Sequence, residues 1–171
     1  MILRHVAYNE LPELASLDAR ANRSPWSLFS YQQSASQPQH KIIGAYDEGS
    51  ELLGACVFSQ VLDEGEILQL CIRYEKQRNG YAYQLLEHVC RELREQQVNQ
   101  IFLEVMVGNL AAINLYHKIG FNVISTRKNY YKVDGKYIDA LVMAKPLYFN
   151  HLPLTAFRTF LRGTNHGNHD T

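Results

Sequence analysis

The chain has no excess of charge of either sign, because 17 Lys and Arg residues balance 17 Asp and Glu residues. Proteins that coat nucleic acid or an anionic membrane depend on summed positive charge. We therefore expect neither direct nucleic-acid binding nor membrane association. The sequence also lacks a run of 18 apolar residues and the apolar core of a signal peptide, which predicts a cytoplasmic protein.

Cysteine is scarce, and its pattern excludes the usual metal and disulfide frameworks. The three residues, Cys56, Cys71 and Cys90, are an odd number, and each lies in an apolar segment. This arrangement favours buried, reduced thiols. The seven histidines form no HExxH motif and no cluster with cysteine. We expect no bound metal.

The length and composition fit a single folded domain. A chain of 171 residues with 46% hydrophobic residues can bury a core of its own but leaves little room for a second domain. The hydrophobic periodicity stops after Pro146, and the chain ends in a stretch rich in Gly, Asn and His. We predict one domain over residues 1–147 and a C-terminal extension over 148–171 that is partly disordered.

The first half of the chain changes from helical to strand-like periodicity. Asn9 precedes leucines at helical spacing and predicts a capped helix, and Ser24-Pro25-Trp26 is typical of the start of a second, short helix. Strand-like runs follow at residues 42–46, 52–62 and 67–72.

The second half alternates helices and strands. Residues 82–93 have the strongest i, i+3, i+4, i+7 pattern in the chain, and 101–107 alternate like a strand. Asn109 and Gly120 mark the start and stop of another helix. Further strands are predicted at 121–126, 130–133 and 137–143, with Asp134-Gly135 as a hairpin turn. The order α-α-β-β-β-α-β-α-β-β predicts an α/β protein with a mixed sheet and helices on its faces.

The segment Gln77-Arg78-Asn79-Gly80-Tyr81-Ala82 lies between a predicted strand and the best helix. Gly80 allows a sharp turn and a close approach of a ligand to the backbone. Free N–H groups at the start of the helix favour a phosphate group, so the loop is a candidate pyrophosphate site. The alternative is a plain turn with charged residues toward solvent.

Two further residues are candidates for proton transfer. Strand alternation puts Phe102, Glu104 and Met106 on one face, where a carboxylate would be partly desolvated and a better base. The alternatives are an exposed strand face or a structural Glu paired with Lys or Arg. Tyr116 lies on the apolar stripe of its helix, where many tyrosines are core residues that need one hydrogen bond. Asn109 alone is most simply a helix cap.

Taken together, these segments form an ordered pattern: Gln-x-x-Gly-x-Ala before a helix, a strand with Glu, then Asn and Ala-x-x-Leu-Tyr-x-x-x-Gly-Phe. The pattern resembles the GNAT superfamily of acyl-CoA N-acetyltransferases over residues 3–147. Within it, Pro25-Trp26-Ser27 and Asn129-Tyr130-Tyr131 are similar to segments of bacterial ribosomal-protein-alanine N-acetyltransferases. The resemblance implies a central, mostly antiparallel mixed sheet with helices on both faces.

The resemblance also implies roles for individual residues. Glu104 would be the general base and Tyr116 the general acid, with no covalent acetyl-enzyme. The residues implied to bind acetyl-CoA are Leu70, Cys71 and Ile72 for the pantetheine and acetyl group, Arg78, Asn79, Gly80, Tyr81, Ala82 and Tyr83 for the pyrophosphate, and Asn109 for the cofactor arm. The chain departs from the family pattern at Ala82, where a second Gly is commoner.

The implied acceptor is the N-terminal amine of a small-subunit ribosomal protein that begins with Ala. An acidic turn at Asp63, Glu64 and Glu66 would attract a basic peptide, although a merely solvated turn explains these residues equally well. A second hypothesis is a small-molecule acetyltransferase for a polyamine or an amino sugar. A third is a non-catalytic acyl-CoA-binding module, against which the presence of both Glu104 and Tyr116 argues.

Overall fold

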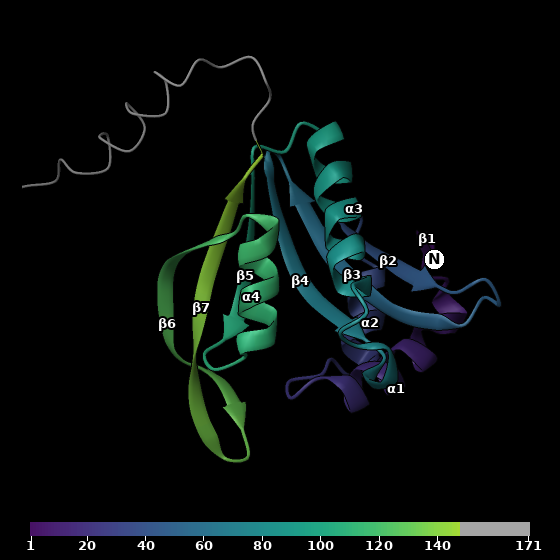
Figure 1. Ribbon diagram of the computed structural model, residues 1–171, viewed down its shortest axis with the longest axis horizontal. Coiled ribbons are helices and arrows are strands. Elements are labelled where there is room, and N and C mark those ends of the chain that lie inside the picture. Colours follow the sequence, from purple (N-terminus) through teal and green to yellow (C-terminus); the bar gives the residue numbers. More distant parts are fainter. Residues whose placement is uncertain (148–171) are drawn as a thin grey trace, which may run out of the picture.

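The computed structural model describes residues 1–147, so the predicted extension 148–171 lies outside the described residues. Seven strands form one sheet in the order β1-β2-β3-β4-β5-β7-β6, with helices on both of its faces (Figure 1). Neighbouring strands are antiparallel except for β4 and β5, which are parallel. The mixed, mostly antiparallel sheet predicted from the sequence is confirmed.

The elements follow one another without long connections. In chain order they are β1 (Ile2–His5), a 3-10 turn (Tyr8–Glu10), α1 (Leu11–Ala21), α2 (Leu28–Ala35), β2 (His40–Tyr46), β3 (Leu52–Val61), β4 (Glu64–Ile72), a second 3-10 turn (Tyr74–Lys76), α3 (Tyr81–Glu95), β5 (Gln100–Met106), α4 (Leu110–Ile119), β6 (Asn122–Val133) and β7 (Lys136–Pro146).

Two hydrophobic clusters lie on opposite faces of the sheet. On one face, α3 and α4 pack on β3, β4 and β5 through buried residues such as Leu86, Val89 and Leu103. On the other, α1 and α2 pack on β2, β3 and β4 through residues such as Leu14 and Tyr31. This second layer lies behind the sheet in the view of Figure 1.

Several predicted boundaries were wrong for identifiable reasons. The four residues of β1 were missed because a short, mostly exposed edge strand leaves little periodic signal. Asn9 does not cap α1, since it lies inside the first 3-10 turn. The second helix begins at Leu28, where the Ser27 side chain accepts the Ser30 N–H, rather than after Ser24. The two strands predicted at 121–126 and 130–133 form the single strand β6, interrupted by bulges.

The feature that positions the site is a separation of the two parallel strands. β4 and β5 pair only from Glu64 opposite Gln100 to Ile67 opposite Leu103, although both strands continue further. One residue later, Leu68 is an extra residue in the β3–β4 pairing. Such a bulge bends a strand and increases its twist, so it accounts for the divergence of β4 from β5.

Candidate active site

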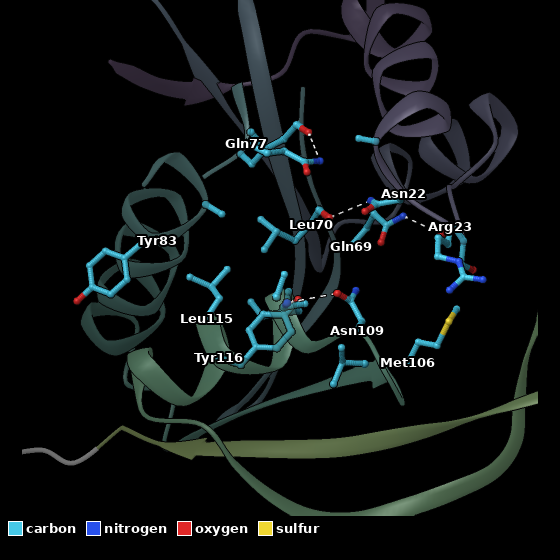
Figure 2. A pocket seen from close by; sticks show the side chains of 18 of the residues that line it. Asn22, Arg23, Gln69, Leu70, Gln77, Tyr83, Met106, Asn109, Leu115 and Tyr116 are labelled. Atoms are coloured by element: carbon cyan, nitrogen blue, oxygen red, sulfur yellow. Dashed lines mark hydrogen bonds between the residues drawn. The ribbon is translucent and has the colours of Figure 1, made fainter. Parts of the chain in front are cut away.

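A cleft of about 630 Å³ lies between the separated ends of β4 and β5. It is lined by these strands, by the loop that leads into α3, by one side of α4 and by the α1–α2 connection (Figure 2). Glu104 and Tyr116 both line it, as do eight of the ten residues predicted to bind the cofactor: Leu70, Ile72, Arg78, Gly80, Tyr81, Ala82, Tyr83 and Asn109. The fold therefore brings most of the predicted site together.

The loop before α3 presents an uninterrupted row of backbone donors. Gly80 caps the helix in the left-handed conformation with φ of +81°, as its predicted role requires, and no side chain caps this end. The preceding and following backbone bonds are Gln77 N to Tyr74 O and Gln84 N to Gly80 O. Within residues 1–147, the N–H groups of residues 78–83 thus have no acceptor, which suits a pyrophosphate.

The surroundings of this row also favour an anion. The first turn of α3 contains no acidic residue, and Lys76, Arg78 and Lys118 line the cleft nearby. A Cβ added to Gly80 would meet only the Gln84 amide, at 3.9 Å, so the space above the glycine is open. Asn79, by contrast, turns back and donates to the carbonyls of Lys76 and Gln77. We interpret Asn79 as a residue that shapes the loop.

The edge of β4 that faces the cleft carries backbone N–H groups that have no acceptor within residues 1–147. Arg73 N donates to Leu53 O on β3, and in an antiparallel pair alternate residues bond to the same neighbour. Leu70 and Ile72 consequently direct their N–H and C=O groups toward the cleft. Both carbonyls are already occupied, because Asn22 Nδ2 donates to Leu70 O at 3.1 Å and Gln77 Nε2 donates to Ile72 O at 3.2 Å. The two N–H groups remain available.

Cys71 is the predicted cofactor residue that points elsewhere. Its side chain is 2% exposed and belongs to the cluster under α1 and α2, not to the cleft lining. Burial raises the pKa of the Cys71 thiol to about 12, with a further contribution from the charge of Asp18. The thiol is therefore protonated at neutral pH and unsuited to nucleophilic attack. All three cysteines are buried and unpaired, as expected from the sequence.

Glu104 lies on the face of β5 that the sequence predicted, and it forms an ion pair with a residue of β6. Its neighbours Leu103 and Val105 are buried under α3 and α4, which leaves the carboxylate on the opposite face, as alternation predicted. The side chain is 15% exposed, and its Oε1 lies 2.8 Å from Nε of Arg127 on β6. Partial desolvation and pairing with an arginine, two interpretations that the sequence left as alternatives, occur together.

Tyr116 reaches the cleft from the other face. The residue is 7% exposed on α4, and its ring packs edge-on against Phe121. Within residues 1–147, the Tyr116 hydroxyl has no hydrogen-bond partner. Every side-chain nitrogen or oxygen that is fully buried in this range does have a partner, so the Tyr116 hydroxyl is not fully buried. The hydroxyl is thus accessible from the cleft that the residue lines. Burial raises the pKa of Tyr116, so the group is a proton donor at neutral pH.

A bulge in β6 brings three side chains to Glu104. Arg127 pairs with Ala140 and Tyr131 with Ile138, so residues 128–130 lie opposite Asp139 alone. The Asp139 carboxylate accepts the Asn129 N–H at 2.8 Å and fixes this bulge. The Tyr131 hydroxyl donates to Glu104 O at 3.4 Å. The nearby Glu104 carboxylate, together with burial, raises the pKa of Tyr130.

The α1–α2 connection, which lines the cleft, rests on a buried carboxylate that the sequence did not reveal. Asp18 on α1 has no exposed surface and accepts hydrogen bonds from Asn22 Nδ2, Trp26 N, the Tyr31 hydroxyl and Gln69 Nε2. These bonds join α1, α2 and their connection to β4. The only available signal was an acidic residue on the apolar stripe of α1, next to Leu17 and seven residues before Pro25.

The predicted acidic turn lies at the start of β4, at the paired end of the two strands. Asp63 accepts a hydrogen bond from Asn99, while Glu64 and Glu66 line a second groove of about 260 Å³. Glu104 lines both this groove and the cleft, so the two cavities adjoin at this residue. Burial and the charge of Glu104 raise the pKa of Glu66, and Arg127 opposes this effect.

The described residues contain neither a candidate metal-binding group nor a candidate membrane-spanning helix. Residues 1–147 contain no group of three His, Cys, Asp or Glu side chains arranged to hold a metal ion. None of the helices in this range combines the length and the apolar character that a bilayer crossing requires.

Comparison with known proteins places this geometry in context. Residues 8–121 match the model of the acetyltransferase (GNAT) family. The chain is 31% identical over 138 residues to the [ribosomal protein bS18]-alanine N-acetyltransferase of Escherichia coli strain K12, covering 81% of this chain and 92% of that protein. The crystal structure of the ribosomal-protein-S18-alanine N-acetyltransferase from Escherichia coli aligns with a TM-score of 0.80 at 28% identity, over 90% of this chain and 99% of that one. Arabidopsis thaliana NAA60 in complex with acetyl-CoA shares the fold, with a TM-score of 0.77 at 18% identity over 85% and 98% of the two chains.

Proposed function

Because this chain belongs to the acetyltransferase (GNAT) family, we propose that it transfers the acetyl group of acetyl-CoA to the N-terminal amine of a protein. The proposed acceptor is the N-terminal Ala of a small-subunit ribosomal protein in the cytoplasm, with residues 1–147 as the catalytic domain. One observation carries the proposal: Glu104 and Tyr116 enter a single cleft from opposite faces of the sheet, beside a row of free backbone donors.

The fit of the cleft to acetyl-CoA rests on its donor groups. The six N–H groups of residues 78–83 and the cations beside them suit a pyrophosphate. Asn109 lines the cleft, but its side-chain oxygen accepts the Ala112 N–H, so we assign it first to capping α4 and second to contact with the cofactor arm. Acetyl-CoA supplies an activated thioester, and the chain supplies orientation and proton transfer.

The residues divide the work of acetyl transfer as follows. Glu104 accepts a proton from the acceptor amine, directly or through a water, as the new C–N bond forms. The N–H groups of Leu70 and Ile72 donate to the carbonyl oxygen, whose negative charge grows in the transition state. As the C–S bond breaks, Tyr116 donates a proton to the sulfur. Attack in a ternary complex needs no acetylated cysteine, in agreement with the burial of all three thiols.

The proposal favours an α-amine over a lysine side chain for a chemical reason. An amine attacks only when neutral, and with a pKa near 8 about a tenth of an N-terminus is neutral at pH 7, against well under a hundredth of lysine. A modest base is sufficient for the former. The name of the 31% identical Escherichia coli relative, which specifies an alanine of a ribosomal protein, supports the same acceptor class.

The test is mass spectrometry of a mixture after incubation with acetyl-CoA. The mixture contains an Ala-Arg peptide, the same peptide with a blocked α-amine and a free internal lysine, and a polyamine. We expect acetylation of the first alone. Comparable acetylation of the blocked peptide or the polyamine would refute α-amine specificity and favour the small-molecule hypothesis. No product with any amine, despite binding of acetyl-CoA, would favour the non-catalytic module.

A further inference from the structure

Arg127 has two acidic neighbours but forms an ion pair with only one of them. Its Nε lies 2.8 Å from Glu104 Oε1, and its side chain is 58% exposed. Arg127, Glu104 and Glu66 line the same groove, and the charges of the other two both act on Glu66. Glu66 forms no ion pair within residues 1–147. The Arg127 guanidinium therefore has a second candidate partner, the Glu66 carboxylate, in the groove that both residues line.

The position of Arg127 conflicts with the proposed chemistry in the absence of acceptor. An N-terminal amine is mostly protonated at pH 7, so it arrives as a cation. The carboxylate that must receive it is already neutralised by another cation. Two cations on one small, partly desolvated carboxylate repel each other, so the arriving ammonium weakens the pairing between Arg127 and Glu104.

We propose that Arg127 is a displaceable counter-ion, which pairs with Glu104 until the acceptor's ammonium replaces it and then pairs with Glu66. This inference rests on the proposed function, because it takes an amine as the acceptor. Its own support is geometric. Arg127 is mostly exposed and flanks a bulge on an edge strand, where a long side chain can change partner at small cost.

The exchange makes Arg127 a positioning and specificity residue. Only an acceptor that carries its own positive charge can replace the guanidinium and leave Glu104 neutralised, whereas a neutral or blocked terminus gains nothing by displacing it. The bulge that holds Arg127 is fixed by Asp139 through the Asn129 N–H. This contact gives a structural purpose to the Asn-Tyr-Tyr segment and to the aspartate ten residues later.

The experiment measures the Kd of an Ala-Arg peptide by calorimetry with CoA bound, so that no transfer occurs. Arg127→Met removes the competing cation and should tighten binding about two- to five-fold, the size expected for a partly exposed ion pair. Glu66→Gln removes the second partner and should weaken binding by a similar factor. In the double variant the effect of Glu66→Gln should vanish, because no guanidinium remains to be received.

Two controls separate displacement from a general change of charge. Lys128→Met removes an equal charge from the neighbouring exposed residue and should leave the Kd unchanged. The same peptide with an acetylated α-amine should bind wild type and Arg127→Met equally. Weaker or unaltered binding of the free peptide to Arg127→Met would overturn the proposal, as would equal tightening of the blocked peptide or a persisting effect of Glu66→Gln in the double variant. If the wild type binds this peptide but does not acetylate it, the proposed function fails instead.

Discussion

The two sides of the cleft present different chemical groups, backbone N–H groups on one side and side chains on the other. On the side of α3, the contacts come from consecutive backbone N–H groups of one loop, residues 78–83, and from the edge of β4. On the side of β6, they come from side chains on separate strands, with Arg127 bound to Glu104 and Tyr131 bound to the Glu104 backbone. The first side suits a constant ligand such as a pyrophosphate, and the second suits recognition of a variable one.

Substitutions should therefore act differently on the two sides of the cleft. A backbone donor is not removed by changing its own side chain, so the α3 side is sensitive mainly to glycine and to charge. The acceptor side depends on individual carboxylates and on the contacts that aim them.

The strongest test removes the proposed base. Glu104→Gln should lower turnover by roughly 10²- to 10⁴-fold, the usual contribution of one acid–base group, and should preserve the Kd of acetyl-CoA. The loss should partly recover as the pH rises, because a larger fraction of the amine is already neutral. Initial rates across pH check both points. Activity within a few-fold of wild type at pH 7 would exclude Glu104 as the base.

The next test addresses the backbone side. At 100 times its Kd, acetyl-CoA should stabilise the wild type by about 2.7 kcal/mol through mass action. Gly80→Asp should abolish the resulting rise in Tm, since it places a side chain and a negative charge where the phosphate would bind.

Gly80→Asn is the matched control, because it has nearly the same size, tolerates a positive φ and carries no charge. It should retain part of the stabilisation. Full stabilisation of both variants would show that the pyrophosphate binds elsewhere.

The third test concerns the buried carboxylate of Asp18, which anchors the α1–α2 connection beside the cleft. Asp18→Asn leaves one oxygen for four donors and should lower the free energy of unfolding by about 3 kcal/mol. It should also raise the KM of the Ala-Arg peptide several-fold, because Asn22 and the α1–α2 connection lose their anchor. The Kd of acetyl-CoA should change less than two-fold.

Tyr31→Phe serves as its control, since it removes one donor of the same network at a distance from the cleft lining. It should cost about 1 kcal/mol in unfolding and leave the peptide KM unaltered. An unchanged KM in Asp18→Asn would reduce Asp18 to a purely structural residue.

The smallest effect is expected at the acidic turn. Reversing its charge with Asp63→Lys and Glu64→Lys should raise the KM of the Ala-Arg peptide about two- to five-fold and leave acetyl-CoA binding unchanged. Because the turn is exposed, the difference should shrink at high salt. A salt-independent change would point to altered structure at the start of β4, where Asp63 binds Asn99.

Features that depend on neighbouring residues along the chain could be predicted from the sequence, and contacts between distant segments could not. The helix after Gly80, the alternation around Glu104 and the hairpin at Asp134-Gly135 all depend on neighbours along the chain. The structure confirms each, the last with positive φ at both residues. The glycine loop belongs to this group, so its geometry followed from a short stretch of sequence.

The contacts that were missed join distant segments. The pairing of Glu104 with Arg127 depends on a bulge in β6, and the position of Asn22 depends on Asp18 and on the edge of β4. Periodicity does not reveal a bulge, because the extra residues interrupt the pattern in the same way as a loop would. For this reason β6 was predicted as two strands.

The divergence of β4 from β5 has a consequence for hydrogen exchange. The amide protons of Leu70 and Ile72 lie near the middle of a seven-stranded sheet, yet no strand accepts them. They should exchange with deuterium as fast as those of a loop, while the intervening Cys71 amide, directed at β3, exchanges slowly. Alternating fast and slow amides along a central strand would therefore report the open edge in the free protein.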